Sequence, residues 1–173
     1  LTPMFHILGW GMPYVAFMLG CKIILPGKYD YDLILKWLGN EKVNFSHCVP
    51  TILQVLLNHP NADSYDLSNW RVSLGGSKLS RVLAEQANAR GIFVMSGYGM
   101  TETGPVTTTL LKPEHFGLSA EEKIEYLIKS GIPFLGADCK VVDEQNIEVP
   151  HDGRTYGNIL VKSKGSSCEY IKA

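Results

Sequence analysis

The chain has 173 residues, a length typical of one domain. Hydrophobic residues make up 45% and charged residues 19%, which is sufficient for a buried core and excludes a largely disordered chain. Basic and acidic residues number 16 and 17, and the resulting net charge of −1 lacks the basic excess that nucleic-acid-binding surfaces need. We therefore expect small-molecule partners and no nucleic acid.

The cysteines and the longest apolar run bear on cellular location. Cys21, Cys48, Cys139 and Cys168 are far apart and form no metal-binding or redox pair. Such cysteines are typical of a reducing compartment, so we expect a cytoplasmic protein. The apolar run 7–19 is shorter than the ~20 residues of a membrane span, and we expect it to be buried in the protein. The chain opens with Leu-Thr-Pro and without a signal peptide, so we expect an internal part of a longer polypeptide.

Up to residue 95, short apolar runs alternate with amphipathic segments. We predict strands at residues 22–25, 44–49, 71–74 and 92–95, and helices at 31–38, 50–57 and 79–87. Pro50 suits the first turn of a helix, and Gly91 is a typical residue just past a helix end. The alternation predicts a mostly parallel sheet flanked by helices, and the apolar strands predict that helices cover both faces.

After residue 105 the pattern changes. We predict a strand at 106–111, a helix that ends near residue 128, and strands at 138–142 and 158–162 around a turn at 152–153. Ser119 and Glu122 form the capping box that opens this helix. The predicted fold class is α/β with a C-terminal β-rich extension. Residues 1–110 are predicted to form an α/β subdomain, and residues 111–173 a linker helix and the start of a β-rich subdomain.

The segment after the fourth predicted strand is the strongest candidate site, since ligands of such sheets bind beyond the carboxyl ends of the strands. Gly97 and Gly99 flank Tyr98 and permit close approach of a ligand, while Tyr98 offers a flat face with a polar tip. Thr101 supplies a hydroxyl and Glu102 a carboxylate, which together suit a phosphate and its Mg²⁺. A glycine-rich turn with an exposed glutamate is the alternative.

Two further segments are weaker candidates. Residues 75–77 (Gly-Gly-Ser) follow a strand and precede a helix, where backbone N–H groups can meet a base or phosphate; an ordinary connecting loop is the alternative. His6 can act as a proton or hydrogen-bond partner near neutral pH. Trp10, between glycines, can line a cavity. Both His6 and Trp10 can equally be core residues.

In this order the segments resemble the adenylate-forming (AMP-binding) superfamily of acyl-CoA synthetases, luciferases and related adenylation domains. Residues 98–102 match its Tyr-Gly-x-Thr-Glu motif, preceded at 75–77 by its Gly-Gly-Ser/Ala motif. Residues 3–6, 49–51, 131–133, 141–143 and 156–162 also match, with Asn158 in place of the usual acid. Residues 112–123 resemble the medium- and long-chain fatty-acid–CoA ligases.

The resemblance implies one subdomain of the large N-terminal domain of an AMP-forming ligase that uses ATP, Mg²⁺ and coenzyme A. A fatty-acid carboxylate attacks the α-phosphate of ATP to give an acyl-adenylate and pyrophosphate, and the thiol of coenzyme A then displaces AMP. Tyr98 stacks on adenine and Trp10 lines or gates the acyl tunnel. The implied catalytic residues are Thr101, Glu102 (the Mg²⁺ ligand) and His6; the nucleotide-binding residues are Gly75, Gly76, Ser77, Gly97, Tyr98, Gly99, Met100 and Thr101; and the substrate-binding residues are His6, Trp10, Val49, Pro50 and Gly76.

The resemblance also implies what this chain lacks. The superfamily's phosphate loop is expected before residue 1, and its ribose-binding Asp and catalytic Lys after residue 173, so we expect no appreciable ligase activity from the isolated chain. Residues 166–169 depart from the family pattern, so we expect a poorly ordered chain end. A non-catalytic nucleotide-binding or self-associating module, such as a homodimer, and an aryl-acid substrate stay open as alternatives. An amino-acid substrate is disfavoured because residues 7–19 contain no acid.

Overall fold

The computed structural model describes residues 1–170, so residues 171–173 of the predicted segment 111–173 lie outside it. Within residues 1–170 the α-helices are α1 (Ile7–Met18), α2 (Tyr31–Asn40), α3 (Pro50–Leu57), α4 (Arg81–Ala89) and α5 (Ala120–Leu127). The strands are β1 (Phe45–Cys48), β2 (Arg71–Leu74), β3 (Phe93–Met100), β4 (Gly104–Thr108), β5 (Ile132–Pro133), β6 (Ala137–Val142) and β7 (Asn158–Ser163). Short 3₁₀ turns span Ala62–Ser64 and Pro113–His115.

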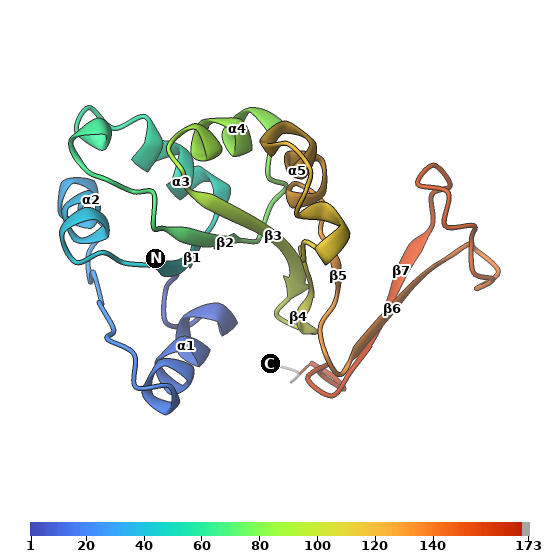
Figure 1. Ribbon diagram of the computed structural model, residues 1–173. Coiled ribbons are helices and arrows are strands. Elements are labelled where there is room, and N and C mark those ends of the chain that lie inside the picture. Colours follow the sequence, from blue (N-terminus) through green and yellow to red (C-terminus); the bar gives the residue numbers. More distant parts are fainter. Residues whose placement is uncertain (171–173) are drawn as a thin grey trace.

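The larger sheet has the order β1-β2-β3-β4-β5. Strands β1, β2 and β3 run parallel, and β4 and β5 join antiparallel to them. Helices α3, α4 and α5 lie over one face, with α2 beside α3, while α1 lies on the other side and contacts β4 (Figure 1). The predicted mostly parallel α/β sheet with flanking helices is confirmed.

The core lies between this sheet and α2 to α5. Trp70 is fully buried in it, and its indole N–H donates to Ser46 Oγ at 2.8 Å, so the polar atom of the ring is satisfied. Along β2, Val72 and Leu74 are buried while Arg71 is exposed. The prediction that helices cover both faces holds in part: α3, α4 and α5 cover one face, while on the other face α1 contacts β4.

Most predicted helices begin where local sequence signals place them. Pro50 is the first residue of α3, and the capping box of α5 forms as expected between Ser119 and Glu122. Asp30 and Ser80 cap α2 and α4 by accepting from backbone N–H groups one turn on. Gly91 follows α4 with a φ of 73°, a left-handed conformation that glycine adopts at little cost.

Strand β3 extends beyond its predicted end. The sequence predicts that this strand ends at residue 95, but it continues as β3 to Met100 and pairs with β4, leaving only residues 101–103 as the turn. The cause is the small size of Gly97 and Gly99. A Cβ on Gly97 would lie 2.9 Å from the carbonyl oxygen of Thr107, and one on Gly99 would overlap the carbonyl of Gly104. These glycines therefore admit a neighbouring strand, not only a ligand. Strand β4 also ends at Thr108 rather than at residue 111.

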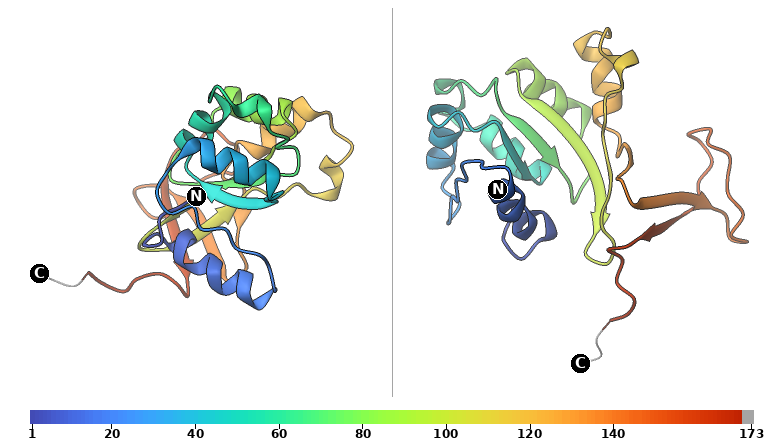
Figure 2. Two further views of the ribbon diagram at one scale, coloured as in Figure 1. Left: turned by 90° about the vertical axis from the view of Figure 1, so that its left-hand side faces the viewer. Right: turned by 60° about the horizontal axis from the view of Figure 1, so that its bottom comes forward.

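Strands β6 and β7 form a separate antiparallel hairpin that projects from the larger sheet (Figure 2). Their bounds match the predicted strands 138–142 and 158–162 closely. The predicted β-rich C-terminal extension is thus confirmed. The domain boundary after residue 110 stays a prediction, and α5 and β5 pack with the larger sheet.

Two expectations for the N-terminal part are wrong. Residues 22–25 form no strand, because within residues 1–170 no strand lies beside them to take up their backbone hydrogen bonds. The apolar run 7–19 forms α1, in which only Gly9 is buried, while Phe17 is 86% and Met18 83% exposed. The helix is apolar on all sides, and the described part of the chain covers little of it. Within residues 1–170 no helix is both long and apolar enough to cross a membrane.

The contact between β3 and β4 generates a stability prediction. Gly99→Ala is expected to lower the free energy of unfolding by about 1–3 kcal/mol, because the new methyl group must displace the β4 backbone. Urea denaturation followed by circular dichroism measures the change. Gly117→Ala is the matched control: its added Cβ meets nothing within 4 Å, so its unfolding midpoint should stay near that of the parent. Equal midpoints for the two variants would contradict the strand contact.

Candidate functional site

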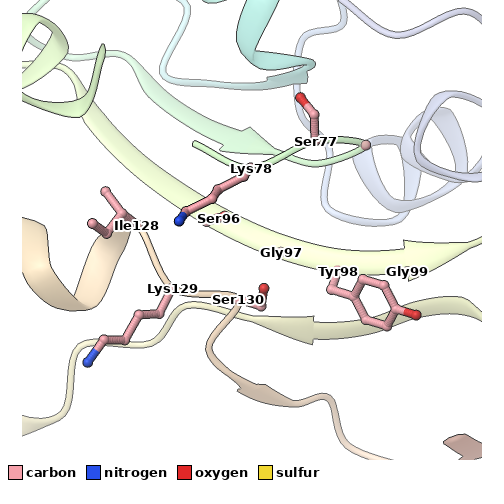
Figure 3. A pocket seen from close by; sticks show the side chains of 10 residues that line it. Ser77, Lys78, Ser96, Gly97, Tyr98, Gly99, Ile128, Lys129 and Ser130 are labelled. Carbon is pink, nitrogen blue, oxygen red and sulfur yellow. The ribbon is translucent and has the colours of Figure 1, made fainter. Parts of the chain in front are cut away.

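A cavity of about 600 Å³ lies between the loop after β2, strand β3 and the segment that follows α5 (Figure 3). It brings together five of the predicted nucleotide-binding residues, from two separate motifs: Gly76, Ser77, Gly97, Tyr98 and Gly99. Its volume falls in the ordinary range for small-molecule sites. The two glycine-containing motifs, predicted from separate stretches of sequence, therefore face one cavity.

The loop after β2 reaches the cavity through a left-handed residue. Gly76 has a φ of 81°, which lets the chain turn from β2 toward α4. A Cβ on Gly76 would lie 3.3 Å from Val49 Cγ1, so the predicted substrate residue Val49 lies against this loop. Val49 is partly exposed before α3, whereas Pro50 is buried as the first residue of that helix. Gly75 adjoins the cavity in sequence without lining it.

Sequence reasoning missed the other residues that line the cavity: Lys78, Ser96, Ile128, Lys129 and Ser130. In Figure 3, Lys78 and Lys129 lie toward the end of the cavity opposite the Tyr98 ring. Lys78 brings a positive charge to the cavity, which favours an anionic ligand, whereas Lys129 Nζ lies over the Tyr126 ring, 5.4 Å from its centroid. Lys78 directly follows the Gly-Gly-Ser motif, so its position could have been inferred. Lys129 carries no local signal, because α5 and its connection bring it to the cavity.

The buried hydroxyl group of Thr109 lies between two segments that line the cavity, strand β3 and the residues at the end of α5. Thr109 Oγ1 accepts from the N–H of Ser96 at 3.2 Å and lies 2.9 Å from the carbonyl oxygen of Ser96. The same oxygen lies 3.3 Å and 2.7 Å from the carbonyl oxygens of Leu127 and Lys129. Strand β3 and the end of α5 are thereby held at a fixed separation.

Thr101 and Glu102 lie outside the cavity, in the turn between β3 and β4, and Met100 ends β3 beside them. The N–H of Met100 donates to Thr103 Oγ1 at 3.1 Å, and the N–H of Thr103 donates to the Met100 carbonyl at 3.2 Å. Gly104 then has a φ of 68°, as in three-residue hairpin loops that end in a left-handed residue. The sequence therefore builds a tight turn that carries a carboxylate.

The carboxylate of Glu102 is suited to a hard cation. The Tyr170 hydroxyl donates to Glu102 Oε1 at 2.8 Å, and this bond, with a smaller contribution from the backbone, holds the pKa of Glu102 below its ordinary value. Within residues 1–170 no cluster of three or more His, Cys, Asp or Glu side chains could hold a metal ion. A single carboxylate is compatible with Mg²⁺, which often takes one or two carboxylates and completes its shell with phosphate oxygens and water.

His6 and Trp10 are exposed at the start of α1, outside the cavity. Trp10 packs edge-to-face on Tyr14, with ring centroids 6.2 Å apart. Ile7 Cδ1 would lie 3.5 Å from a Cβ on Gly104, so the start of α1 lies beside the β3–β4 turn. His6 thus belongs to the same end of the molecule as Glu102, and not to the end with the cavity lysines.

The segment before His6 is tied to β1 through a buried histidine. Thr2 Oγ1 lies 2.8 Å from His47 Nδ1. Burial lowers the pKa of His47 to about 4. The folded chain therefore keeps this imidazole neutral at pH 7.

This burial predicts acid sensitivity. A histidine with an unfolded pKa near 6.5 protonates more readily in the unfolded chain, so stability is complete above about pH 6.5 and falls as the pH drops toward 4. The loss is expected to reach about 3 kcal/mol near pH 4. Urea denaturation at a series of pH values measures it, with His47→Gln as the control that cannot titrate. The same dependence on pH in both proteins would refute the assignment to His47.

The comparisons agree with this architecture. A family model described as AMP-binding enzyme matches residues 1–171. The chain is 34% identical over 165 residues to a long-chain-fatty-acid–CoA ligase of Thermus thermophilus, and 34% identical over 166 residues to a medium-chain-fatty-acid–CoA ligase of Ectopseudomonas oleovorans. Each match covers 94% of this chain and 30% of the relative, so the chain spans under a third of their length.

Solved structures also superpose on this chain. The N-terminal domain of FACL13 from Mycobacterium tuberculosis superposes with a TM-score of 0.80 at 23% identity, over 98% of this chain and 41% of that one. An O-succinylbenzoate coenzyme A synthetase from Bacillus subtilis, solved with ATP and magnesium, gives a TM-score of 0.75 at 25% identity, over 99% of this chain and 34% of that one. The fold is that of the N-terminal domain of adenylate-forming enzymes. The chain belongs to the AMP-binding enzyme family.

Proposed function

We propose that the chain provides the base pocket and the metal-binding carboxylate of an ATP-dependent fatty-acid–CoA ligase. The observation that carries the proposal is the cavity of about 600 Å³, at which the Gly-Gly-Ser loop, Tyr98 and two lysines meet. It has the parts that a nucleotide needs: a flat aromatic face, close backbone and positive charge. The reaction joins an acid to ATP with release of pyrophosphate, and the thiol of coenzyme A then displaces AMP.

Each residue has a role in this proposal. Tyr98 stacks on adenine, and Gly97 and Gly99 beside it carry no side chain that would keep the base away. The loop Gly75–Ser77 borders the base on the other side. Lys78 and Lys129 line the same cavity at the end opposite the Tyr98 ring, away from the β3–β4 turn.

The β3–β4 turn carries the phosphate and metal functions. Thr101 donates its hydroxyl to a phosphate, Met100 supplies backbone at the same point, and Glu102 holds Mg²⁺. The cation, when bound, neutralises the charge on the phosphates during attack by the acid. The start of α1 supports a role for His6 beside the acid, because it lies next to this turn. Trp10, Val49, Pro50 and Gly76 border the acyl group.

A medium- or long-chain fatty acid is the proposed substrate, supported by the names of two relatives at 34% identity. An aryl acid is the runner-up within the family, and a panel of acids offered to the full-length enzyme distinguishes them. A cytoplasmic location is proposed on the four free cysteines.

A second candidate function is self-association. Phe5, Trp10, Tyr14 and Phe17 are all at least half exposed at or near α1, and a contiguous exposed apolar surface marks an interaction site. Analytical ultracentrifugation of the chain distinguishes a stable homodimer from a monomer.

The base pocket is tested by removing its aromatic face. Tyr98→Ala is expected to weaken ATP binding in the presence of Mg²⁺ at least about fivefold, because stacking of a base on an aromatic ring contributes ~1–3 kcal/mol. Isothermal titration calorimetry measures the affinity. Tyr156→Ala is the matched control, since Tyr156 is 97% exposed and lies outside the cavity. Unchanged affinity in Tyr98→Ala would contradict the proposed site.

The reaction is tested by comparing lengths of polypeptide. The 173-residue chain alone is expected to release no pyrophosphate above background, because it spans under a third of the length of the ligases that it resembles. The full-length enzyme is expected to release pyrophosphate only when ATP, Mg²⁺ and a fatty acid are all present. Acid-dependent pyrophosphate release from the chain alone would refute the expectation.

A further inference from the structure

The C-terminal segment, residues 163–170, runs along the turn that carries Glu102. Ser163 Oγ donates to the carbonyl oxygen of Thr103 at 3.2 Å. The N–H of Ser167 donates to the carbonyl oxygen of Glu102 at 2.7 Å, and Ser167 Oγ donates to the same oxygen at 3.2 Å. Figure 2 shows this segment leaving β7 beside the tip of the β3–β4 hairpin. Ser163, Ser167 and Tyr170 thus bond to the β3–β4 turn, while the expected poor order of the chain end stays a prediction.

Tyr170 extends this contact to the side chain of Glu102. Its hydroxyl donates to Glu102 Oε1 at 2.8 Å, although the ring itself is 77% exposed. An ionised carboxylate has about four acceptor positions on two oxygens, so one such bond leaves acceptors for a cation. Glu102 is thus held at both ends: Ser167 fixes its backbone carbonyl and Tyr170 fixes one carboxylate oxygen.

We propose that Tyr170 is a positioning residue for Glu102, which orients the carboxylate for Mg²⁺. This inference rests on the proposed function, in which Glu102 is the metal ligand. A glutamate in an exposed turn otherwise samples many rotamers, and ordering it on metal binding costs conformational entropy. A hydrogen bond that restricts the side chain beforehand reduces that cost, as partners of metal-ligating carboxylates commonly do.

The alternative explanation is that the C-terminal segment only stabilises the hairpin. The two explanations differ in the readout that they affect. A stabilising role is shared by Ser163 and Ser167, which bond to backbone carbonyls of the turn and not to the Glu102 side chain, and it changes the amount of folded protein. A positioning role belongs to Tyr170, and it changes the metal concentration that the enzyme needs.

The experiment uses Tyr170→Phe in the full-length enzyme, a change that removes only the hydroxyl. Two quantities are measured: Mn²⁺ binding in the presence of ATP, followed by electron paramagnetic resonance without any acid substrate, and the Mg²⁺ dependence of acid-driven pyrophosphate release. The expected result is an increase of about tenfold in the Mn²⁺ dissociation constant and in the Mg²⁺ concentration for half-maximal rate. The rate at saturating Mg²⁺ should stay within about twofold of the parent rate.

Two further variants separate the possible failures. Tyr156→Phe removes the hydroxyl group of another exposed tyrosine. It should change neither the Mn²⁺ dissociation constant nor the Mg²⁺ concentration for half-maximal rate. Glu102→Gln should weaken Mn²⁺ binding at least as much as Tyr170→Phe. If Glu102→Gln weakens metal binding and Tyr170→Phe does not, the positioning role is refuted while the proposed function survives. If Glu102→Gln leaves metal binding unchanged, both are refuted. A lower saturating rate in Tyr170→Phe with unchanged metal affinity also refutes the positioning role.

Discussion

The close approach of β3 and β4 is the constraint on which the candidate site depends. The two backbones come so near that Gly97 and Gly99 leave no room for a Cβ. As a result β3 continues as one paired strand from the buried core, past the cavity, to the turn at 101–103. Tyr98 therefore lies on a paired strand, with a register shift between Tyr98 and Gly99, and Glu102 lies in the tight turn that follows the strand. Pairing with β4 on both sides of this turn restricts where the two groups can lie.

The buried hydroxyl of Thr109 supports the same arrangement from the side. It accepts one backbone N–H and lies near three carbonyl oxygens, those of Ser96, Leu127 and Lys129. Within residues 1–170 no buried side-chain polar atom lacks a hydrogen-bond partner, so the buried Thr109 hydroxyl is itself satisfied. The position of Lys129 at the cavity thus follows from a residue that does not itself line the cavity.

Local signals predicted α2 to α5 and most strands well, but not α1 as a helix. The capping box at Ser119 and the proline at residue 50 lie at the helix starts, and β2 has the predicted bounds 71–74. Features that need a distant partner were not predictable in the same way. Residues 22–25 have strand-like composition, but a strand forms only where a neighbour takes up its hydrogen bonds. The apolar run that forms α1 was expected to be buried, yet apolar composition does not say what covers a helix.

In the candidate site too, residues in contiguous motifs were predictable from sequence, whereas residues brought there by tertiary packing were not. The motifs around Gly76 and Tyr98 were readable because each is contiguous in sequence, and both line the cavity. Lys129 and Ser130 line it too, but they arrive there through the packing of α5 on α4. The contact between Tyr170 and Glu102 spans 68 residues and has no counterpart in any periodicity or spacing. Such contacts follow from tertiary structure, and only coordinates give them.

The hydrogen bonds of the Thr109 hydroxyl with the backbone of Ser96, Leu127 and Lys129 affect where the sequence can change in length. The chain leaves the sheet at Thr109 and returns to it with Lys129. The intervening residues 110–128 form a connection with a short 3₁₀ turn and helix α5, and both ends of this segment are held by these hydrogen bonds. Closing a somewhat longer loop costs little additional entropy. Insertions or deletions in the connection 110–118 can therefore accumulate, and alter the outer surface, without a change of shape where the base is expected to bind.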